Sequence, residues 1–165
     1  MTTDIVVLLL VTAQRLSELV IAQRNTAELL AKGGVEYGRS HYPVMVALHA
    51  SWLLGLWYFG RNATVVWSLL IAYLALQGFR VWILATLGRR WTTRIITVPG
   101  EKLVARGPYR FMRHPNYALV ALEVPLLPLV FGLTGFAMVF GLLNLAMLAW
   151  RISVEETRLR EFRSS

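Results

Sequence analysis

Long apolar runs separated by short polar stretches make up most of this chain. Because about 20 apolar residues cross a hydrocarbon core roughly 30 Å thick, we predict a membrane-spanning helix in each run. The runs lie near residues 3–23, 42–60, 64–86, 117–132 and 134–152. The fourth is short and contains Pro125 and Pro128, so we expect a kinked or marginally spanning helix there. The five helices predict an integral membrane helical bundle that ends in a helical hairpin.

The one long polar stretch, residues 87–116, separates the third run from the fourth. It holds Trp91 and several β-branched residues, which predicts a loop lying along the headgroup region with Trp91 as an interfacial anchor. No repeat or flexible linker divides the chain. We therefore predict a single all-α membrane domain, residues 1–165. Residues 1–86 form its three-helix part, and residues 87–165 form an interfacial cytoplasmic loop, the hairpin and a tail.

The composition agrees with a membrane location and excludes several chemistries. The chain is 56% hydrophobic and only 16% charged, too little polar surface to cover a water-soluble globule. There is no cysteine, which excludes disulfides and thiolate chemistry. The histidines are spread too widely for a metal-ligand spacing, so we expect no metal site.

The distribution of Lys and Arg predicts the orientation of the bundle. The first loop, the third loop and the C-terminal tail would share one side, and together they hold thirteen Lys and Arg residues. The opposite side holds Arg61 alone. Because cytoplasmic loops collect positive charge, we expect the N-terminus outside and the C-terminus in the cytoplasm. The net charge of +8 then favours contact with anionic membrane lipids, and no nucleic-acid-binding motif accompanies it.

Several charged residues fall inside the predicted spans, where each costs about 2.5–3.5 kcal/mol unless it is compensated. Arg15 and Glu18 lie three residues apart on the first helix, which predicts an internal ion pair. Glu123 on the fourth helix has no partner nearby in the sequence. We expect it to pair with Arg80 or Arg15 and to hold the bundle together rather than to take part in catalysis.

Two polar clusters stand at the ends of the last two helices. The stretch Gly107-Pro-Tyr-Arg-Phe-Met-Arg-His-Pro-Asn-Tyr117 precedes the fourth helix, and Arg151, Glu155 and Glu156 close the fifth. At 100° per residue, Asn144, Arg151 and Glu155 project within about 40° of one another, whereas Glu156 points about 100° away from Glu155. An ion pair between Arg151 and Glu155 would be the purely structural explanation of this pattern. Together, the two clusters indicate a site at one membrane face.

These residues resemble a known signature. Gly107-Pro-Tyr109, Arg113-His-Pro-Asn-Tyr117, the Pro125–Pro128 segment and Arg151-x-x-x-Glu155-Glu156 are similar to the C-terminal signature of the isoprenylcysteine carboxyl methyltransferase family, over about residues 87–162. Arg24-Asn25, Glu36-Tyr37-Gly38 and His41-Tyr-Pro43 resemble a bacterial branch, some of whose members methylate hydroxyl groups of long-chain alkylpyrones or alkylresorcinols. The resemblance implies a protein of the bacterial inner membrane.

The resemblance also implies S-adenosylmethionine as the methyl donor and assigns roles to residues. Five side chains would contact this cofactor, namely Tyr109, Arg113, His114, Tyr117 and Glu156. Gly107 would let the backbone approach it closely. Arg151 and Glu155 match the family's catalytic pair at the acceptor end. His41 and Asn144 are further candidates for the acceptor pocket.

The residue types suit methyl transfer, which is an in-line displacement that needs positioning and an electron-rich acceptor. Arg151 would orient a carboxylate through two hydrogen bonds. A phenol or enol must lose a proton, and Glu155, or else His114, would accept it. The acceptor stays open among a prenylcysteine, a phenolic lipid, a phospholipid amine and a fatty acid.

Two other classes of protein remain as alternatives. One is an NADPH-dependent membrane reductase of the sterol-reductase type. In such an enzyme, the basic third loop would bind the 2′-phosphate of NADPH. The other is a small non-enzymatic membrane protein whose polar residues only join its helices.

Overall fold

A computed structural model of the chain describes residues 2–164 of the backbone and the side chains of residues 2–157. Five helices dominate it, as predicted. In chain order the elements are α1 (Thr3–Ala31), β1 (Val35–Tyr37), α2 (Tyr42–Gly60), α3 (Trp67–Leu87), η1 (Gly88–Arg90), β2 (Ile95–Thr97), η2 (Gly107–Arg110), α4 (Pro115–Val130) and α5 (Thr134–Ser164).

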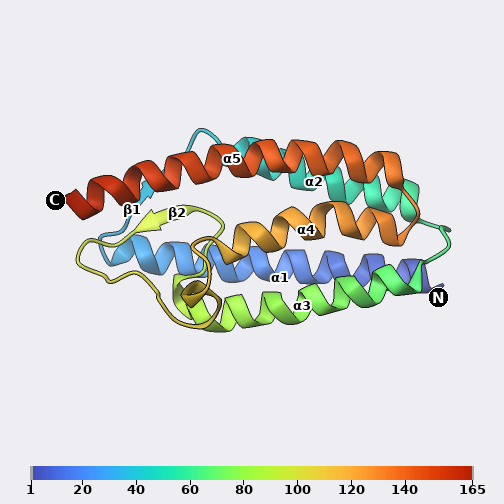
Figure 1. The fold of residues 1–165 in the computed structure, drawn as a ribbon, viewed down its shortest axis with the longest axis horizontal. Helices are drawn as coiled ribbons and strands as arrows, with labels where there is room; N and C mark the ends of the chain where they lie inside the picture. Colours follow the sequence, from blue (N-terminus) through green and yellow to red (C-terminus); the bar gives the residue numbers. More distant parts are fainter. Residues whose placement is uncertain (1, 165) are drawn as a thin grey trace.

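The five helices run side by side along the long axis of an elongated bundle (Figure 1). The N-terminus lies at one end and the C-terminus at the other. Both strands, both short 3-10 helices and the long loop after α3 gather at the C-terminal end (Figure 1). The polar segments of the chain therefore share one end of the bundle.

Four of the helices, α1, α2, α3 and α5, are long and apolar enough to cross a membrane. Large apolar side chains stand exposed along them, including Leu10, Leu54, Ile71 and Leu142 at 65–70% exposure. In water such surfaces would be unfavourable, whereas in a bilayer they face lipid tails. The protein is thus an integral membrane helical bundle.

The first helix extends beyond its predicted span of residues 3–23 and ends at Ala31. Its last turns are polar, but residues 27–31 are good helix formers, and Lys32 pairs with Glu28 one turn back at 3.1 Å. The helix stops before Gly33, whose φ of +83° favours glycine. The end of α1 therefore reaches past the apolar zone into the polar end of the bundle.

The fourth helix is short, as its sequence predicts. Its 16 residues rise about 24 Å, less than a hydrocarbon core. Pro128 cannot donate a hydrogen bond to the carbonyl of Val124 four residues earlier. The indole N–H of Trp52 on α2 donates to that carbonyl instead, at 2.9 Å. This bond satisfies a backbone group that lipid could not.

A two-stranded antiparallel ribbon at the polar end was not predicted. β1, from the first loop, pairs with β2, from the third loop, with Val35 opposite Thr97. Glu36 on β1 accepts a hydrogen bond from Arg94 at 2.8 Å, which adds an ion pair to the ribbon. The expectation for Trp91 was wrong, because its side chain is buried against Ala22, Ile83 and Leu119 instead of lying among headgroups.

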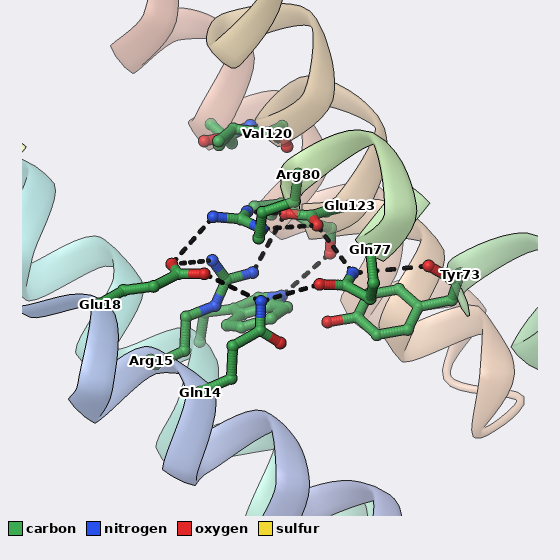
Figure 2. A network of polar contacts seen from close by, with 11 residues as sticks. Gln14, Arg15, Glu18, Tyr73, Gln77, Arg80, Val120 and Glu123 are labelled. Carbon is green, nitrogen blue, oxygen red and sulfur yellow. Dashed lines mark hydrogen bonds and ion pairs between the residues drawn. The ribbon is translucent and has the colours of Figure 1, made fainter. Parts of the chain in front are cut away.

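A buried ion-pair network joins three helices in the middle of the bundle (Figure 2). Arg80 on α3 pairs with Glu123 on α4 and, at 2.9 Å, with Glu18 on α1. Arg15 pairs with Glu123 at 3.1 Å and with Glu18 at 3.3 Å. The predicted Arg15–Glu18 pair is confirmed, and Glu123 takes both of the partners proposed for it.

Amide side chains complete this network. Gln77 donates to Glu123 at 2.8 Å, and Gln14 donates to Gln77 at 2.8 Å and to Glu18 at 2.9 Å (Figure 2). Two guanidinium groups and two carboxylates give a net charge of zero. Charge neutrality and multiple hydrogen bonds are what a low-dielectric environment requires of buried ions.

Candidate active site

A cavity of about 480 Å³ lies at the polar end of the bundle. Its walls come from the end of α1, the segment from η1 through β2, the loop residues 101–105, the start of α4 and the end of α5. This volume falls in the range of roughly 300–1,000 Å³ that is usual for pockets holding small molecules. The cavity therefore has the size and position of a ligand site next to the membrane.

Seven of the predicted site residues line this cavity. They are Tyr109, Arg113, His114, Tyr117, Arg151, Glu155 and Glu156. Residues 109–117 come from the segment before α4 and its first turn, and residues 151–156 from the last turns of α5. The hairpin of α4 and α5 is what brings them together.

His114 stands between the two acidic residues. Its Nδ1 lies 3.8 Å from a carboxylate oxygen of Glu155, and its Nε2 lies 3.6 Å from one of Glu156. Its ring stacks on Tyr117, with centroids 5.4 Å apart. It occupies the N-cap position of α4 before Pro115, as predicted, but its side chain makes no capping hydrogen bond. The imidazole is thus turned toward the carboxylates of the cavity.

The two acids have different partners, which agrees with their different directions on the helix. The Tyr117 hydroxyl donates to Glu155 at 2.6 Å. Glu156 lies 3.9 Å from Arg113, which is 79% exposed. Burial, together with the nearby Glu155 carboxylate, raises the pKa of Tyr109 to about 12. Tyr109 therefore presents a neutral phenol to the cavity.

Arg151 is a buried cation at the wall of the cavity. Its guanidinium donates to the backbone carbonyl of Thr93 at 3.0 Å and to the sulfur of Met45, and it lies over the ring of Tyr117. The ion pair with Glu155 that would explain these residues structurally is not formed. No carboxylate of the described residues lies within ion-pair distance of Arg151. An uncompensated buried guanidinium favours binding of an anion.

Three predicted site residues do not line the cavity. Gly107 has a φ of +57° and packs so closely on Thr86 that an added Cβ would lie 2.3 Å from the threonine hydroxyl. Asn144 is fully buried on α5 and donates to the backbone carbonyl of Val120 at 3.2 Å. His41 is buried at the start of α2, and its ring packs edge-on against Trp150. Their proposed roles remain predictions.

The sequence interpretation missed part of the cavity wall. β2 and loop residues 101–105 contribute a large part of it, together with Trp91 and Asn116. Nothing in the local pattern of these residues distinguishes them from an ordinary interfacial loop. Of these wall residues, Asn116 was the one that the sequence indicated as part of the site, because it lies inside the Arg113–Tyr117 motif.

The fold and the cavity describe an integral membrane protein with a polar ligand site at one end. The model of the isoprenylcysteine carboxyl methyltransferase (ICMT) family matches residues 68–161. The chain belongs to this family of membrane methyltransferases, whose enzymes generally use S-adenosylmethionine. The matched region contains all seven cavity-lining residues named above and excludes α1, the first loop and α2.

Two bacterial proteins are similar to the chain over nearly its whole length. "Uncharacterized protein YpbQ" of Bacillus subtilis (strain 168) is 35% identical over 162 residues, covering 90% of this chain and 92% of the relative. An uncharacterized protein of Haemophilus influenzae is 25% identical over 161 residues, covering 89% of each chain. No solved structure matches the chain significantly.

Proposed function

We propose that this protein transfers a methyl group from S-adenosylmethionine to a carboxylate or hydroxyl oxygen of a lipophilic acceptor, such as a prenylcysteine or a long-chain phenolic lipid. The proposed orientation places the polar end of the bundle in the cytoplasm and the N-terminus outside. The observation that carries the proposal is the cavity, in which acids, aromatic rings, a histidine and an unpaired buried cation meet next to the membrane.

The residues of the cavity suit S-adenosylmethionine. Four buried polar atoms of its lining residues have no hydrogen-bond partner within the described part of the chain: Trp91 Nε1, His114 Nε2, Asn116 Oδ1 and Arg151 Nε. Buried donors and acceptors without partners are costly, and a polar ligand removes that cost. Glu155 and Glu156 offer carboxylates for ribose hydroxyls or a cationic amine, and Tyr109 and Tyr117 offer rings for a base.

S-adenosylmethionine, when bound, supplies an activated methyl group on a positively charged sulfur. The chain must hold the acceptor oxygen in line with that group, keep water out and stabilise negative charge on the oxygen. Arg151 is suited to the last task, because it is a buried guanidinium with no carboxylate partner among the described residues. An amine acceptor would gain nothing from this cation, so we favour an acidic oxygen.

The bilayer position explains how two unlike substrates would meet. A lipophilic acceptor would reach the end of the bundle through the membrane, whereas the charged cofactor would come from water. The apolar α4 begins directly after His114, which lines the cavity, and this supports a cavity close to the boundary of the two phases.

Transfer of a labelled methyl group tests the proposal. The purified protein in lipid nanodiscs would be incubated with methyl-labelled S-adenosylmethionine and, in turn, a long-chain phenol, a fatty acid and a prenylcysteine. We expect label in at least one product, and a loss of about a hundredfold or more when Arg151 is replaced by Met. Label in none of the products, despite intact cofactor binding, would contradict the assignment of the acceptor.

A further inference from the structure

His41 is a buried histidine, only 1% exposed. No other residue among those whose side chains are described gives its Nδ1 or its Nε2 a hydrogen-bond partner. A buried imidazole with both nitrogens unsatisfied is costly, since each unpaired group loses its hydration without replacement. The ring therefore keeps hydrogen-bonding capacity that the described fold does not use.

The chain around His41 is shaped to hold this ring. Gly38 has a φ of +64°, and a Cβ there would lie 2.2 Å from Nε2 of His41. The ring therefore packs directly on the backbone of Gly38, and a larger residue would displace it. The ring of His41 also packs edge-on against Trp150 on α5, with ring centroids 5.7 Å apart.

Met45 connects the turn of His41 to Arg151. Met45 follows His41 by one helical turn on α2, with the Met45 N–H donating to the His41 carbonyl at 3.0 Å. The sulfur of Met45 accepts from the guanidinium of Arg151. Thr93 links the same two helices, because its carbonyl binds Arg151 at 3.0 Å and its hydroxyl lies 3.2 Å from that of Tyr42. Two buried groups with unused nitrogens, His41 and Arg151, thus share one small region.

The sulfur of Met45 marks a place beside Arg151 where an acceptor oxygen could bind instead. A thioether is a weak hydrogen-bond acceptor, whereas a phenolate or enolate oxygen is a strong one for a guanidinium. Methionine is unbranched and flexible, so its side chain can move aside at small cost. An oxygen in place of the sulfur would contact Arg151. A role for His41 then requires its imidazole, on the residue one turn before Met45, to reach that oxygen.

We infer that His41 is the general base of an acceptor subsite formed with Arg151, and that this subsite is built for an acidic hydroxyl group. The inference rests on the proposed methyl transfer. The hydroxyl O–H bond breaks and its proton moves to an imidazole nitrogen. The oxygen forms a bond to the methyl carbon, and the electron pair of the breaking carbon–sulfur bond stays on sulfur. The products are the methyl ether and the demethylated cofactor, and the imidazolium then loses its proton to water.

The protonation state of His41 fits this role. Burial lowers the pKa of the ring below its usual 6.5, and the positive charge of Arg151 lowers it further. Arg151 on α5 is the charged group that acts on it. The imidazole is therefore neutral at pH 7 and able to accept a proton. A carboxylate acceptor would not need this base, since it arrives ionised.

Two acceptors of equal chain length, a phenol and a carboxylic acid, test the inference in nanodiscs. His41→Gln should lower kcat on the phenol by about 10²- to 10⁴-fold, the usual contribution of a general base. The loss of kcat on the carboxylate should be at least about tenfold smaller, because a carboxylate needs no base. Equal losses on both acceptors would show a structural role for His41, and no loss on the phenol would show that it is not the base. Either result overturns the inference.

A pH profile of the unaltered protein gives a second test that needs no variant. An ordinary phenol ionises near pH 10. If His41 is the base, kcat on the phenol rises with pH through a pKa below the usual 6.5 of histidine and then levels off well before pH 10, because the ring is then deprotonated. A rate that keeps rising tenfold per unit toward pH 10 would mean that only preionised phenol reacts, which would overturn the inference.

A binding measurement separates this inference from the proposed function. A long-chain nitrophenol, whose phenolate is coloured, would be titrated into the protein without cofactor. Arg151 and His41 should together raise the bound phenolate fraction about tenfold or more at a pH below the probe's own pKa, and His41→Gln should reverse much of this effect. An unchanged fraction in the variant contradicts the inference. Calorimetry with S-adenosylhomocysteine, run alongside, reports independently on the proposed function.

Discussion

Removing Glu123 should strongly destabilise the bundle. This carboxylate is fully buried and accepts hydrogen bonds from Gln77, from Arg80 and from Arg15. Glu123→Met keeps a side chain of similar length but leaves two guanidinium groups with Glu18 as the remaining carboxylate of the network (Figure 2). The cluster then changes from neutral to a net charge of +1.

The expected loss follows from the burial of this cluster. Removing one partner of a buried ion pair costs roughly 3–5 kcal/mol, because the remaining charge is left uncompensated. Arg80→Met leaves Glu123 and Glu18 with Arg15 alone and should cost a similar amount. The double replacement Arg80→Met with Glu123→Met keeps the Arg15–Glu18 pair and restores neutrality. It should therefore cost clearly less than the sum of the two single replacements.

Reversible unfolding in mixed detergent and SDS micelles, followed by circular dichroism, would give the free energies of unfolding. Leu122→Met is the matched control, because Leu122 precedes Glu123 on α4 and is 57% exposed to lipid. This control should change stability by about 0.5 kcal/mol or less. A loss below about 1 kcal/mol for Glu123→Met, or additive losses in the double variant, would refute the reasoning.

Two further predictions concern η2, the short helix before α4. Gly107→Ala forces a Cβ into Thr86 at a positive φ, so it should cost more than about 1–2 kcal/mol of stability. Gly132 also has a positive φ but faces open space, so Gly132→Ala should cost only the backbone strain. Thermal unfolding of both variants measures the difference. The raised pKa of Tyr109 means that the folded protein resists its ionisation. Its contribution to stability is fully present below pH 10 and is lost as pH rises toward 12. Tyr109→Phe should flatten this alkaline loss, and an unchanged profile would contradict the assignment.

Hydropathy was sufficient to predict the five helices, because each carries its own apolar signal. The end of α1 was predicted too early because hydropathy falls at Arg24, Asn25 and Thr26, although the helix continues to Ala31. The ribbon of β1 and β2 could not be predicted, because each strand has three residues and its partner lies about 60 positions away. Such short strands carry no readable alternation, and their pairing depends on how the helices place the two loops.

The candidate site was predictable where helical geometry determines it. The direction of Arg151 and Glu155 on α5 and the approach of Glu155 to His114 followed from spacing and from the hairpin. The structural alternative of an Arg151–Glu155 ion pair could not be decided, because Tyr117 competes for the carboxylate and Thr93 for the guanidinium. Those partners come from other elements, which one sequence does not place.

Calorimetric titration of the purified protein with S-adenosylmethionine, S-adenosylhomocysteine and NADPH tests the central claim most directly. We expect saturable binding of the first two and none of NADPH. His114→Ala should weaken both affinities about tenfold or more, because it removes one hydrogen bond to a charged group. The control Arg39→Ala, at an exposed side chain, should leave both affinities unchanged. Binding of NADPH alone would instead indicate a reductase and contradict the roles assigned to Arg151 and Glu155. Binding of none of the three would contradict the claim that the cavity holds S-adenosylmethionine.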